Sequence, residues 1–137
     1  MRIMAIDCGD VRTGVAVCDK LEMLASPLCV VKETDETSLV EKLCEKAREE
    51  GAELLVVGLP KNMDGSLGGR AQKCIEIADL LAQKSGLEVR MWDERLTTVM
   101  SYRSLNSANV YGKKSKQLVD AVAAATILQG FIDSRRN

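Results

Sequence analysis

Apolar residues occur along the chain in short runs, and from residue 35 onward these runs alternate with helical stripes. Five runs predict strands, at residues 2–7, 13–19, 23–31, 53–57 and 87–92. The third run is interrupted by Pro27. The first three runs are separated only by short turns, so the chain opens like a β-meander.

Stripes with helical spacing fill the intervals between the later strands. Thr34 or Asp35 can cap a first helix and Gly51 is suited to end it. The stripe of this helix is Leu39, Val40, Leu43 and Ala47. A second helix, ending at Gly86, is predicted to turn inward Ala71, Cys74, Ile75, Ala78, Leu81 and Ala82. Beyond the last strand we expect a short helical stretch to about residue 106, a polar loop over 107–116 and an alanine-rich helix from 117 to about 132.

The predicted order of elements is β-β-β-α-β-α-β-α. Strands that alternate with helices after a meander predict an α/β fold with a mixed five-stranded sheet flanked by helices. We expect residues 1–137 to form one domain, because no linker, repeat or low-complexity segment divides them. In such sheets functional groups gather where strands end and loops begin.

Acidic residues stand at several of these predicted ends. Asp7 closes the first strand, Asp93 and Glu94 close the fifth, and Asp120 falls in the predicted first turn of the last helix. Each acid alone has an ordinary interpretation, as a turn former or as a complement to a helix dipole. Carboxylates brought together, however, repel one another unless a cation lies between them. Such oxygen ligands suit Mg²⁺ or Mn²⁺, which can generate hydroxide and neutralise phosphate charge.

The composition restricts how such a site could work. Hydrophobic residues make up 46% of the chain and charged residues 28%, which is typical of a globular protein. The chain contains no histidine. This excludes a Ser-His-Asp triad, a Cys-His pair, an HExxH zinc site and a histidine general base. If the protein is an enzyme, carboxylates, lysines or a metal must supply its acid–base chemistry.

Charge is distributed unevenly although the formal net charge is only −1. Residues 1–69 carry 8 Lys and Arg against 13 Asp and Glu, whereas residues 70–137 carry 11 against 7. The second half includes Lys113, Lys114 and Lys116, which fall in the predicted polar loop. A short basic loop of this kind is explained equally well by phosphate binding and by solubility.

The surroundings of the cysteines, together with the lack of a recognisable targeting or membrane-spanning segment, predict a cytoplasmic protein. No two of the five cysteines are in a C-x-x-C spacing, and most adjoin apolar residues. We interpret them as small hydrophobic residues in a reducing cytosol. No stretch approaches the ~20 apolar residues of a membrane span, and the apolar run before Asp7 is too short for a signal peptide.

Four segments, in order, resemble the YqgF/RuvX family. They are Asp7-x-Gly9-x-x-Arg12-x-Gly14-Val15-Ala16-Val17; Val57-Gly58-Leu59-Pro60-x-Asn62-Met63-Asp64-Gly65; Asp93-Glu94-Arg95-Leu96-Thr97-Thr98; and Val119-Asp120 with Ala123-Ala124 and Ile127-Leu128-Gln129. The resemblance covers nearly the whole chain, and the second and third segments are the specific ones. The chain departs from the family pattern at Val11, where a basic residue is common, and at Ala121, where a polar residue is common.

The resemblance implies an RNase H-like nuclease domain that cleaves phosphodiester bonds with a divalent metal, Mg²⁺ or Mn²⁺. It places Asp7, Glu94 and Asp120 at the positions of the family's catalytic and metal-binding acids. Alternation along an extended chain aims only one of Asp93 and Glu94 inward; the resemblance favours Glu94, and periodicity leaves the choice open. Asp7 would bridge two ions, which can stabilise both the attacking and the leaving oxygen of an in-line displacement.

The expected partner is nucleic acid, and no membrane partner is expected. The candidate substrate-binding residues are Arg12, Asn62, Arg70, Lys113, Lys114 and Lys116. Aromatic residues make up only 3% of the chain and are scattered, so recognition should depend on backbone and shape more than on base stacking.

Several functions remain open at this point. The family includes pre-16S rRNA nucleases, which process the 5′ end in ribosome biogenesis, and Holliday junction resolvases. We prefer the RNA substrate, acted on by a monomer or a homodimer. The first segment also resembles the phosphate loop of actin-like ATPases and sugar kinases, which would require a dimer to close around a nucleotide. A non-catalytic RNA or protein adaptor is the remaining alternative.

Overall fold

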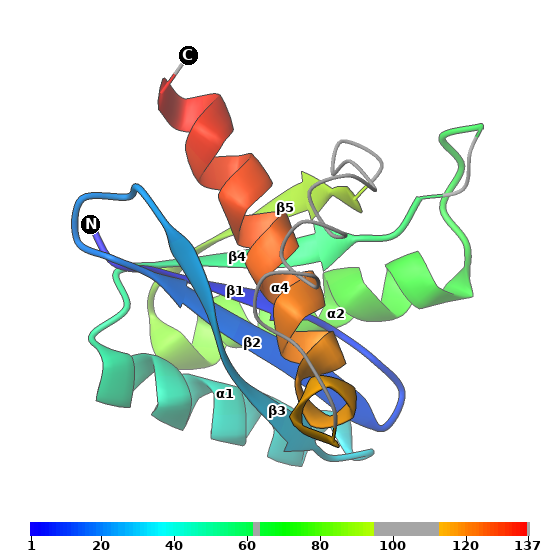
Figure 1. Ribbon diagram of the computed structural model, residues 1–137. Coiled ribbons are helices and arrows are strands. Elements are labelled where there is room, and N and C mark those ends of the chain that lie inside the picture. The colour runs from blue at the N-terminus through cyan, green and yellow to red at the C-terminus, as the bar shows by residue number, and fades with distance from the viewer. Residues whose placement is uncertain (62–63, 95–112, 137) are drawn as a thin grey trace.

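A five-stranded mixed sheet runs through the middle of the molecule (Figure 1). The computed structural model describes residues 1–61, 64–94 and 113–136, and within the last range side chains are described from 119 to 135. The elements are β1 (Ile3–Asp7), β2 (Arg12–Cys18), β3 (Ala25–Lys32), α1 (Glu36–Glu50), β4 (Leu54–Leu59), α2 (Gly69–Ser85), β5 (Glu88–Asp93) and α4 (Lys113–Arg136). This order confirms the predicted α/β arrangement. The short helical stretch expected after residue 95 lies outside the described residues.

The strand order is β3-β2-β1-β4-β5, so β1 is central. β1, β2 and β3 pair antiparallel as the predicted meander, whereas β4 and β5 join parallel to β1. The carboxyl ends of β1, β4 and β5 therefore meet at one edge of the sheet. β3 continues through Pro27, which lies opposite Ala16 beside a register shift. Proline is tolerated there because β3 is an edge strand.

Helices cover both faces of the sheet (Figure 1). α1 and α2 pack on one face, and α4 crosses the other. The alternation of strand side chains assigns Met4, Ile6 and Cys8 to the face of α1 and α2. Ile3, Ala5 and therefore Asp7 belong to the face of α4.

Local signals set the ends of the first two helices. The Asp35 carboxylate accepts a hydrogen bond from the Ser38 backbone N–H at 2.9 Å, so Asp35, of the two candidates, is the cap of α1. Gly51 ends α1 with φ 67°, a left-handed conformation that favours glycine. Of the residues predicted to face inward from α2, Ala71, Cys74, Ala78 and Leu81 are buried, whereas Ile75 and Ala82 are only half-buried. Ile77, which was not predicted, is buried. Ile77 follows Cys74 by three residues and so extends the same stripe.

The last helix begins earlier than the sequence predicts. Lys113, Lys114 and Lys116 lie in the first turns of α4 and not in a loop. This stretch contains no glycine or proline, and lysine and glutamine favour helix. The earlier start leaves Asp120 beyond the first turn, so the placement of Asp120 in the first turn is wrong, and with it the interpretation of this acid as a complement to the helix dipole, because that effect is confined to the first turn.

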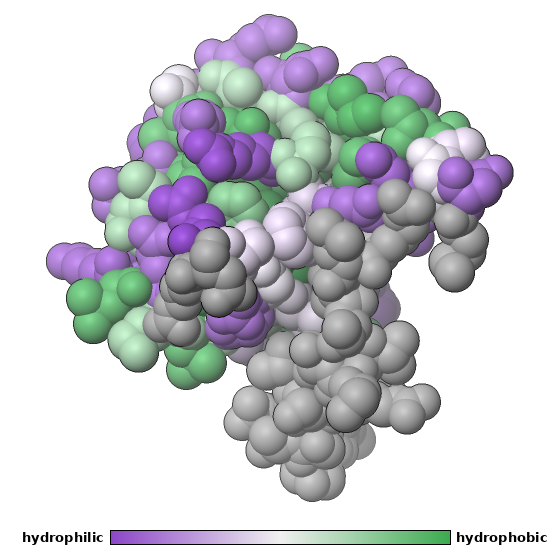
Figure 2. Space-filling model, turned by 90° about the horizontal axis from the view of Figure 1, so that it is seen from above, coloured by the Kyte–Doolittle hydropathy of each residue, from purple (hydrophilic) through white to green (hydrophobic). Residues whose placement is uncertain are grey.

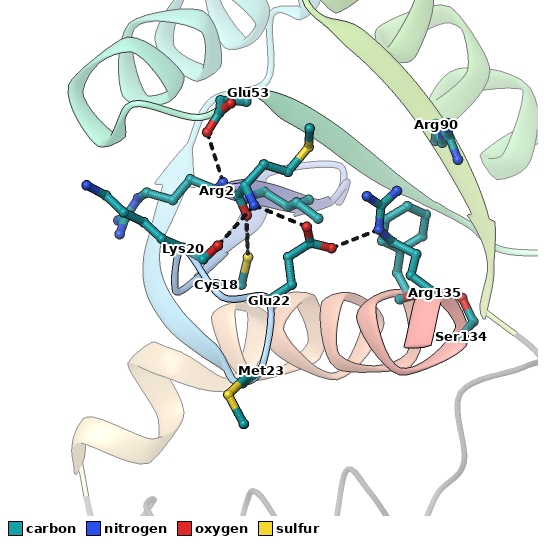
Figure 3. Close-up of polar contacts among 12 residues, drawn as sticks. Arg2, Cys18, Lys20, Glu22, Met23, Glu53, Arg90, Ser134 and Arg135 are labelled. Carbon is teal, nitrogen blue, oxygen red and sulfur yellow. Dashed lines mark hydrogen bonds and ion pairs between the residues drawn. The ribbon is translucent and has the colours of Figure 1, made fainter. Parts of the chain in front are cut away.

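The C-terminal half of α4 is fastened to the β2–β3 turn. The Gln129 side chain accepts from the Ala25 N–H at 2.9 Å and donates to the Met23 carbonyl at 3.2 Å. Figure 3 shows Glu22 pointing from this turn to Arg135, whose Nε lies 2.8 Å from a Glu22 oxygen. These contacts fix one end of α4, and its approach to β2 fixes the other.

α4 approaches β2 most closely at Gly14. A Cβ atom added to Gly14 would lie 1.8 Å from the Asp120 carbonyl oxygen and 2.9 Å from the Ala121 nitrogen. Both atoms belong to the helix backbone, so they cannot rotate away as a side chain could. The lack of a side chain at Gly14 is therefore what brings Asp120 down to the sheet.

Among the described helices, none is both long and apolar enough to cross a membrane. On the face shown in Figure 2, hydrophobic and hydrophilic residues are interspersed across the described part of the surface.

We predict that Gly14→Ala lowers the free energy of unfolding by about 2–4 kcal/mol, because the new methyl group displaces α4 from the sheet. Urea unfolding measures this, and Gly69→Ala is the matched control. A Cβ at Gly69 meets nothing within 4 Å and lies in a helix, so this change should be neutral or stabilising by up to about 1 kcal/mol. Equal effects of the two substitutions would contradict the packing described for Gly14.

Candidate active site

Asp7 lies between two glycines on the face of the sheet that α4 covers. Its antiparallel neighbour across the β1–β2 pair is Gly14. On the other side Ile6 pairs with Val57, so the next residue of β4, Gly58, lies beside Asp7. Both neighbours lack side chains, and this leaves space on each side of the Asp7 carboxylate for a group from another element.

Glu94 fills the space over Gly58. A Cβ added to Gly58 would lie 3.2 Å from the Glu94 carboxyl carbon and 2.6 Å from Cδ1 of Ile127 in α4. Gly58 pairs with Trp92 of β5, and Glu94 is two residues further along, on the same side. Asp93 lies 3.9 Å, oxygen to nitrogen, from the Lys61 ammonium. Glu94 is therefore the acid that lies over the α4 face of the sheet beside Asp7.

Asp120 reaches the same face from the opposite side. Its backbone rests on Gly14, the neighbour of Asp7. Its residue is half-buried and its charge acts on Asp7. The fold thus brings three acids that are far apart in sequence to one end of the sheet.

The cluster is electrostatically unfavourable when all its members are ionised. The pKa of Asp7 is raised to about 7, first by burial, then by the Glu94 carboxylate, and further by Asp120. The pKa of Glu94 is also raised, mainly by burial, with Asp93 adding to it. The Arg70 guanidinium opposes the rise in the pKa of both carboxyl groups.

The donor set fits a hard divalent cation. In the described part of the chain, no three Asp, Glu or Cys side chains are grouped closely enough to hold an ion as they stand. The three acids therefore share one region of the sheet without forming a closed set of ligands. Their ligand atoms are carboxylate oxygens, the type that Mg²⁺ and Mn²⁺ prefer. A cation placed among them would also remove the repulsion that raises the pKa of Asp7.

Two of the predicted substrate-binding cations lie on segments close in sequence or space to Asp7. Arg70, at the start of α2, donates from Nη2 to the Cys8 carbonyl at 3.4 Å, and Arg12 is exposed at the start of β2. Asn62 and the side chains of Lys113, Lys114 and Lys116 lie outside the described residues.

Sequence reasoning missed two further cations. Lys61 follows the end of β4 and lies near Asp93, and Lys73 Nζ lies 3.5 Å from Asp10. Lys73 could have been found from its position three residues after Arg70, on the same side of the helix.

Cys8 lies directly behind the site, on the opposite face of the sheet. It is buried against Cys74 of α2, and this contact, together with burial, raises the pKa of the Cys8 thiol well above its usual value. All five cysteines are free, and every one except the half-buried Cys29 is buried. Their interpretation as small core residues is confirmed.

A cavity of about 280 Å³ lies apart from the acids. It is lined by residues from the C-terminal ends of α1 and α2, among them Ala47, Arg48 and Lys84, and by Ala52 and Leu87, which precede β4 and β5. That position is at the edge of the sheet opposite to the carboxyl ends of β1 and β5. The cavity is therefore not part of the candidate site.

Solved structures resemble this fold over its full length. The structure of Thermus thermophilus RuvC matches with a TM-score of 0.66 and 16% identity, covering 99% of this chain and 96% of that one. A Fowlpox virus resolvase in complex with Holliday junction DNA matches with a TM-score of 0.63 and 10% identity, covering both chains completely. These likenesses define the fold as RNase H-like.

Sequence comparison then gives the family. A family model described as "RuvX: Holliday junction resolvase" matches residues 1–134. A protein from Clostridium novyi (strain NT) named "Putative pre-16S rRNA nuclease" is 40% identical over 134 residues, covering 98% of this chain and 99% of the relative. A protein of the same name from Acetivibrio thermocellus is 42% identical over 137 residues, covering 98% and 97%. The chain belongs to the RuvX family.

We predict that Asp7→Asn stabilises the metal-free protein at pH 8. A carboxyl group whose pKa is raised by folding supports stability while it is protonated, below about pH 4, and this support is lost as pH rises through about 7. Removing the charge should therefore raise the free energy of unfolding by roughly 2 kcal/mol or more at pH 8 and by much less at pH 5.

Urea unfolding in EDTA, followed by the fluorescence of the single tryptophan, Trp92, measures this difference. Asp10→Asn is the matched control, because the Asp10 side chain is 91% exposed and its replacement should change stability by less than about 0.5 kcal/mol at either pH. A lower free energy of unfolding for Asp7→Asn than for the parent at pH 8 would show that the ionised Asp7 carboxylate does not destabilise the folded protein.

Proposed function

We propose that the protein is a single-domain, divalent-metal-dependent endonuclease that hydrolyses phosphodiester bonds. The observation that supports this proposal is that Asp7 and Glu94 lie on the face of the sheet that α4 covers, and that the backbone of α4 at Asp120 approaches Gly14, the neighbour of Asp7. We further propose that it acts in the cytoplasm on the 5′ end of precursor 16S rRNA. The name of the curated relatives at about 40% identity supports this choice of substrate.

The three acids have distinct tasks in this proposal. Asp7 is the central ligand, because it lies between the space filled by Glu94 and the approach of Asp120. Glu94 and Asp120 complete the ligand set from the two sides. A divalent cation bound there, Mg²⁺ or Mn²⁺, supplies Lewis acidity that neutralises phosphate charge and makes water more acidic.

The surrounding cations would hold the nucleic-acid backbone. Arg70 contacts the Cys8 carbonyl in the segment that follows Asp7, and Arg12 ends that segment at the start of β2. Lys61, near Asp93, and Lys73, near Asp10, would extend this basic rim. Contacts with phosphates fix the position of a strand without reading its sequence. Asn62, Lys113, Lys114 and Lys116 stay predicted members of the same surface.

A four-way DNA junction is the second candidate substrate. The description of the family model favours it. A junction resolvase makes paired cuts and so would act as a two-fold symmetric dimer, whereas trimming one end of an RNA requires only a monomer. One cleavage assay with both labelled substrates can distinguish these two functions.

We predict that the pure protein cleaves labelled precursor 16S rRNA when Mn²⁺ or Mg²⁺ is present and not in EDTA. Asp7→Asn, Glu94→Gln and Asp120→Asn should each lower the cleavage rate by at least about 100-fold, because each removes an anionic ligand. Labelled four-way junction DNA forms the second arm. Cleavage of the junction alone, by a dimer, would assign the resolvase activity in place of RNA processing.

Asp93→Asn is the matched control for Glu94→Gln. Its carboxylate lies 3.9 Å from the Lys61 ammonium, and alternation along β5 directs it to the face of the sheet opposite to Glu94, so the rate should stay within about threefold of the parent. Parental cleavage by Asp7→Asn would refute the hydrolytic mechanism. A large loss in Asp93→Asn with none in Glu94→Gln would exchange the roles of these two acids.

A further inference from the structure

The cavity of about 280 Å³ is formed where α1 and α2, which cover the same face of the sheet, reach their C-terminal ends (Figure 1). Nearer the middle of the two helices, Leu43 and Leu81 are fully buried in the core. The cavity is lined instead by small side chains, among them Ala47, Ala52 and Ser85. Side chains of this size do not fill the space between the helix ends, so the sequence itself leaves the cavity open.

Two cationic side chains from different helices line this cavity. Arg48 is in the last turn of α1, and Lys84 is in the last turn of α2. Both charges reach the Cys44 thiol in the cavity wall. Burial raises the pKa of this thiol, and the positive charges of Arg48 and Lys84 oppose that rise. The two cations therefore act on the same space.

Basic residues in the last turn of a helix can simply complement the helix dipole and its free carbonyl groups. Here carbonyl groups at both helix ends already have other donors. The Gly51 N–H donates to carbonyls of the last turn of α1, and the Gly86 N–H and the Ser85 hydroxyl do the same in α2. The donors of Arg48 and Lys84 are thus available to another acceptor.

Among the residues that the structure describes, neither cation is in a close ion pair. Arg48 has no carboxylate partner within 4.0 Å, and Lys84 Nζ lies 3.6 Å from Glu41, whose side chain is 65% exposed. Glu49 and Glu50 follow Arg48 in the chain, but each pairs with a different cation, at 3.2 and 2.8 Å. Loose pairs between exposed side chains are weak and are readily exchanged. The cavity therefore presents positive charge that close ion pairs do not balance.

The remaining wall indicates what kind of anion fits. Cys44, Ala47 and Leu87 give it an apolar part, so a ligand needs an apolar body as well as an anionic group. Two cations on separate helices are best balanced by two negative charges on oxygens that point in several directions. A phosphate monoester meets this requirement, whereas a carboxylate carries only one charge. The volume is just below the roughly 300–1,000 Å³ of pockets for drug-sized ligands, so the apolar body must be small.

We propose that this cavity binds a small organic phosphate monoester, with its phosphate between Arg48 and Lys84 and its apolar body against Ala47 and Leu87. The cavity adjoins Ala52 and Leu87, which precede β4 and β5, whereas the acid cluster lies at the opposite ends of these strands. The inference therefore does not rest on the proposed function. The monoester can belong to a free small molecule or to the terminal phosphate of an RNA strand, since an internal phosphodiester carries only one charge.

NMR titration of the ¹⁵N-labelled chain with phenyl phosphate at pH 8 tests the site. The probe carries nearly two negative charges at this pH, and EDTA keeps divalent cations from drawing it to the acid cluster. The amide signals of Gly51, Ala52 and Leu87 should shift and saturate, whereas that of Gly58, beside Asp7, should not move. Inorganic phosphate should bind at least about tenfold more weakly, because it has no apolar body to bury.

Three variants and a matched control identify the contacts. Arg48→Gln and Lys84→Gln should each weaken binding of phenyl phosphate at least about fivefold, because each removes a charged donor. Ala52→Leu keeps both cations but fills the cavity, and it should weaken binding at least about tenfold. Lys42→Gln is the control: its ammonium pairs with Glu33 on α1 away from the cavity, so its loss should change the affinity less than about twofold. The signals of residues remote from each substitution verify that the variant is folded.

Uridine 5′-monophosphate and a short RNA with a 5′ phosphate distinguish the two sources of the monoester. Both should bind, and Arg48→Gln should weaken both. Tighter binding of the RNA, lost when its 5′ phosphate is removed, assigns the cavity to an RNA end. Equal or tighter binding of the mononucleotide assigns it to a free small molecule.

Lack of saturable shifts at Gly51, Ala52 and Leu87 would overturn the proposal. Inorganic phosphate binding as tightly as phenyl phosphate would do the same. So would equal losses in Lys42→Gln and Arg48→Gln, or parental affinity in Ala52→Leu, since both would indicate attraction to surface charge and not a cavity. None of these results bears on metal-dependent cleavage, which depends on the acid cluster.

Discussion

The half-buried carboxylate of Asp7, with a glycine on each side, is the constraint on which the rest of the structure depends. At Gly14 the missing side chain lets the backbone of α4 rest on β2, which delivers Asp120. At Gly58 it leaves the space that the Glu94 side chain occupies. Bulk at either position would separate one acid from Asp7. The two glycines therefore determine which carboxylates can meet, although neither carries any chemistry itself.

The cluster works against the stability of the protein alone. Burial and mutual repulsion raise the pKa of Asp7 to about 7, so near neutral pH the fold holds a carboxyl group that resists ionisation. Strain of this kind is typical of functional sites and must be offset elsewhere. Here α4 is fastened at its far end by Gln129 and by the Glu22–Arg135 pair, and its apolar side packs on the sheet. These contacts hold α4, and with it Asp120, in a fixed position against the sheet that carries Asp7.

Much of the fold followed from local patterns. The five strands, the cap at Asp35 and the stop at Gly51 were predictable because apolar runs and capping residues act over a few positions. The start of α4 was not, because Lys113 and its neighbours are polar residues that suit both a loop and a solvated helix. The same error placed Asp120 in the first turn. The sequence predicted Ile75 to be buried, whereas the structure buries Ile77. Both positions fit a helical stripe, and the choice between them depends on which side of the helix faces the sheet, which local patterns do not give.

The candidate site was predictable residue by residue only where the family resemblance supplied it. Asp7, Glu94 and Asp120 could be named, but the choice of Glu94 over Asp93 depends on Gly58 and Lys61, which the sequence separates from them by more than 30 residues. The basic rim shows the same limit. Arg70 could be proposed from its charge, whereas its contact with the Cys8 carbonyl depends on how α2 lies against the end of β1.

Anomalous diffraction from crystals soaked in Mn²⁺ tests most directly whether the three acids form one cation site. We expect the strongest anomalous peak among the carboxylate oxygens of Asp7, Glu94 and Asp120, at about 2.0–2.3 Å from at least two of them. We expect no peak there in crystals of Asp7→Asn. Mn²⁺ bound elsewhere on the molecule, with none at the carboxyl ends of β1 and β5, would contradict the central claim.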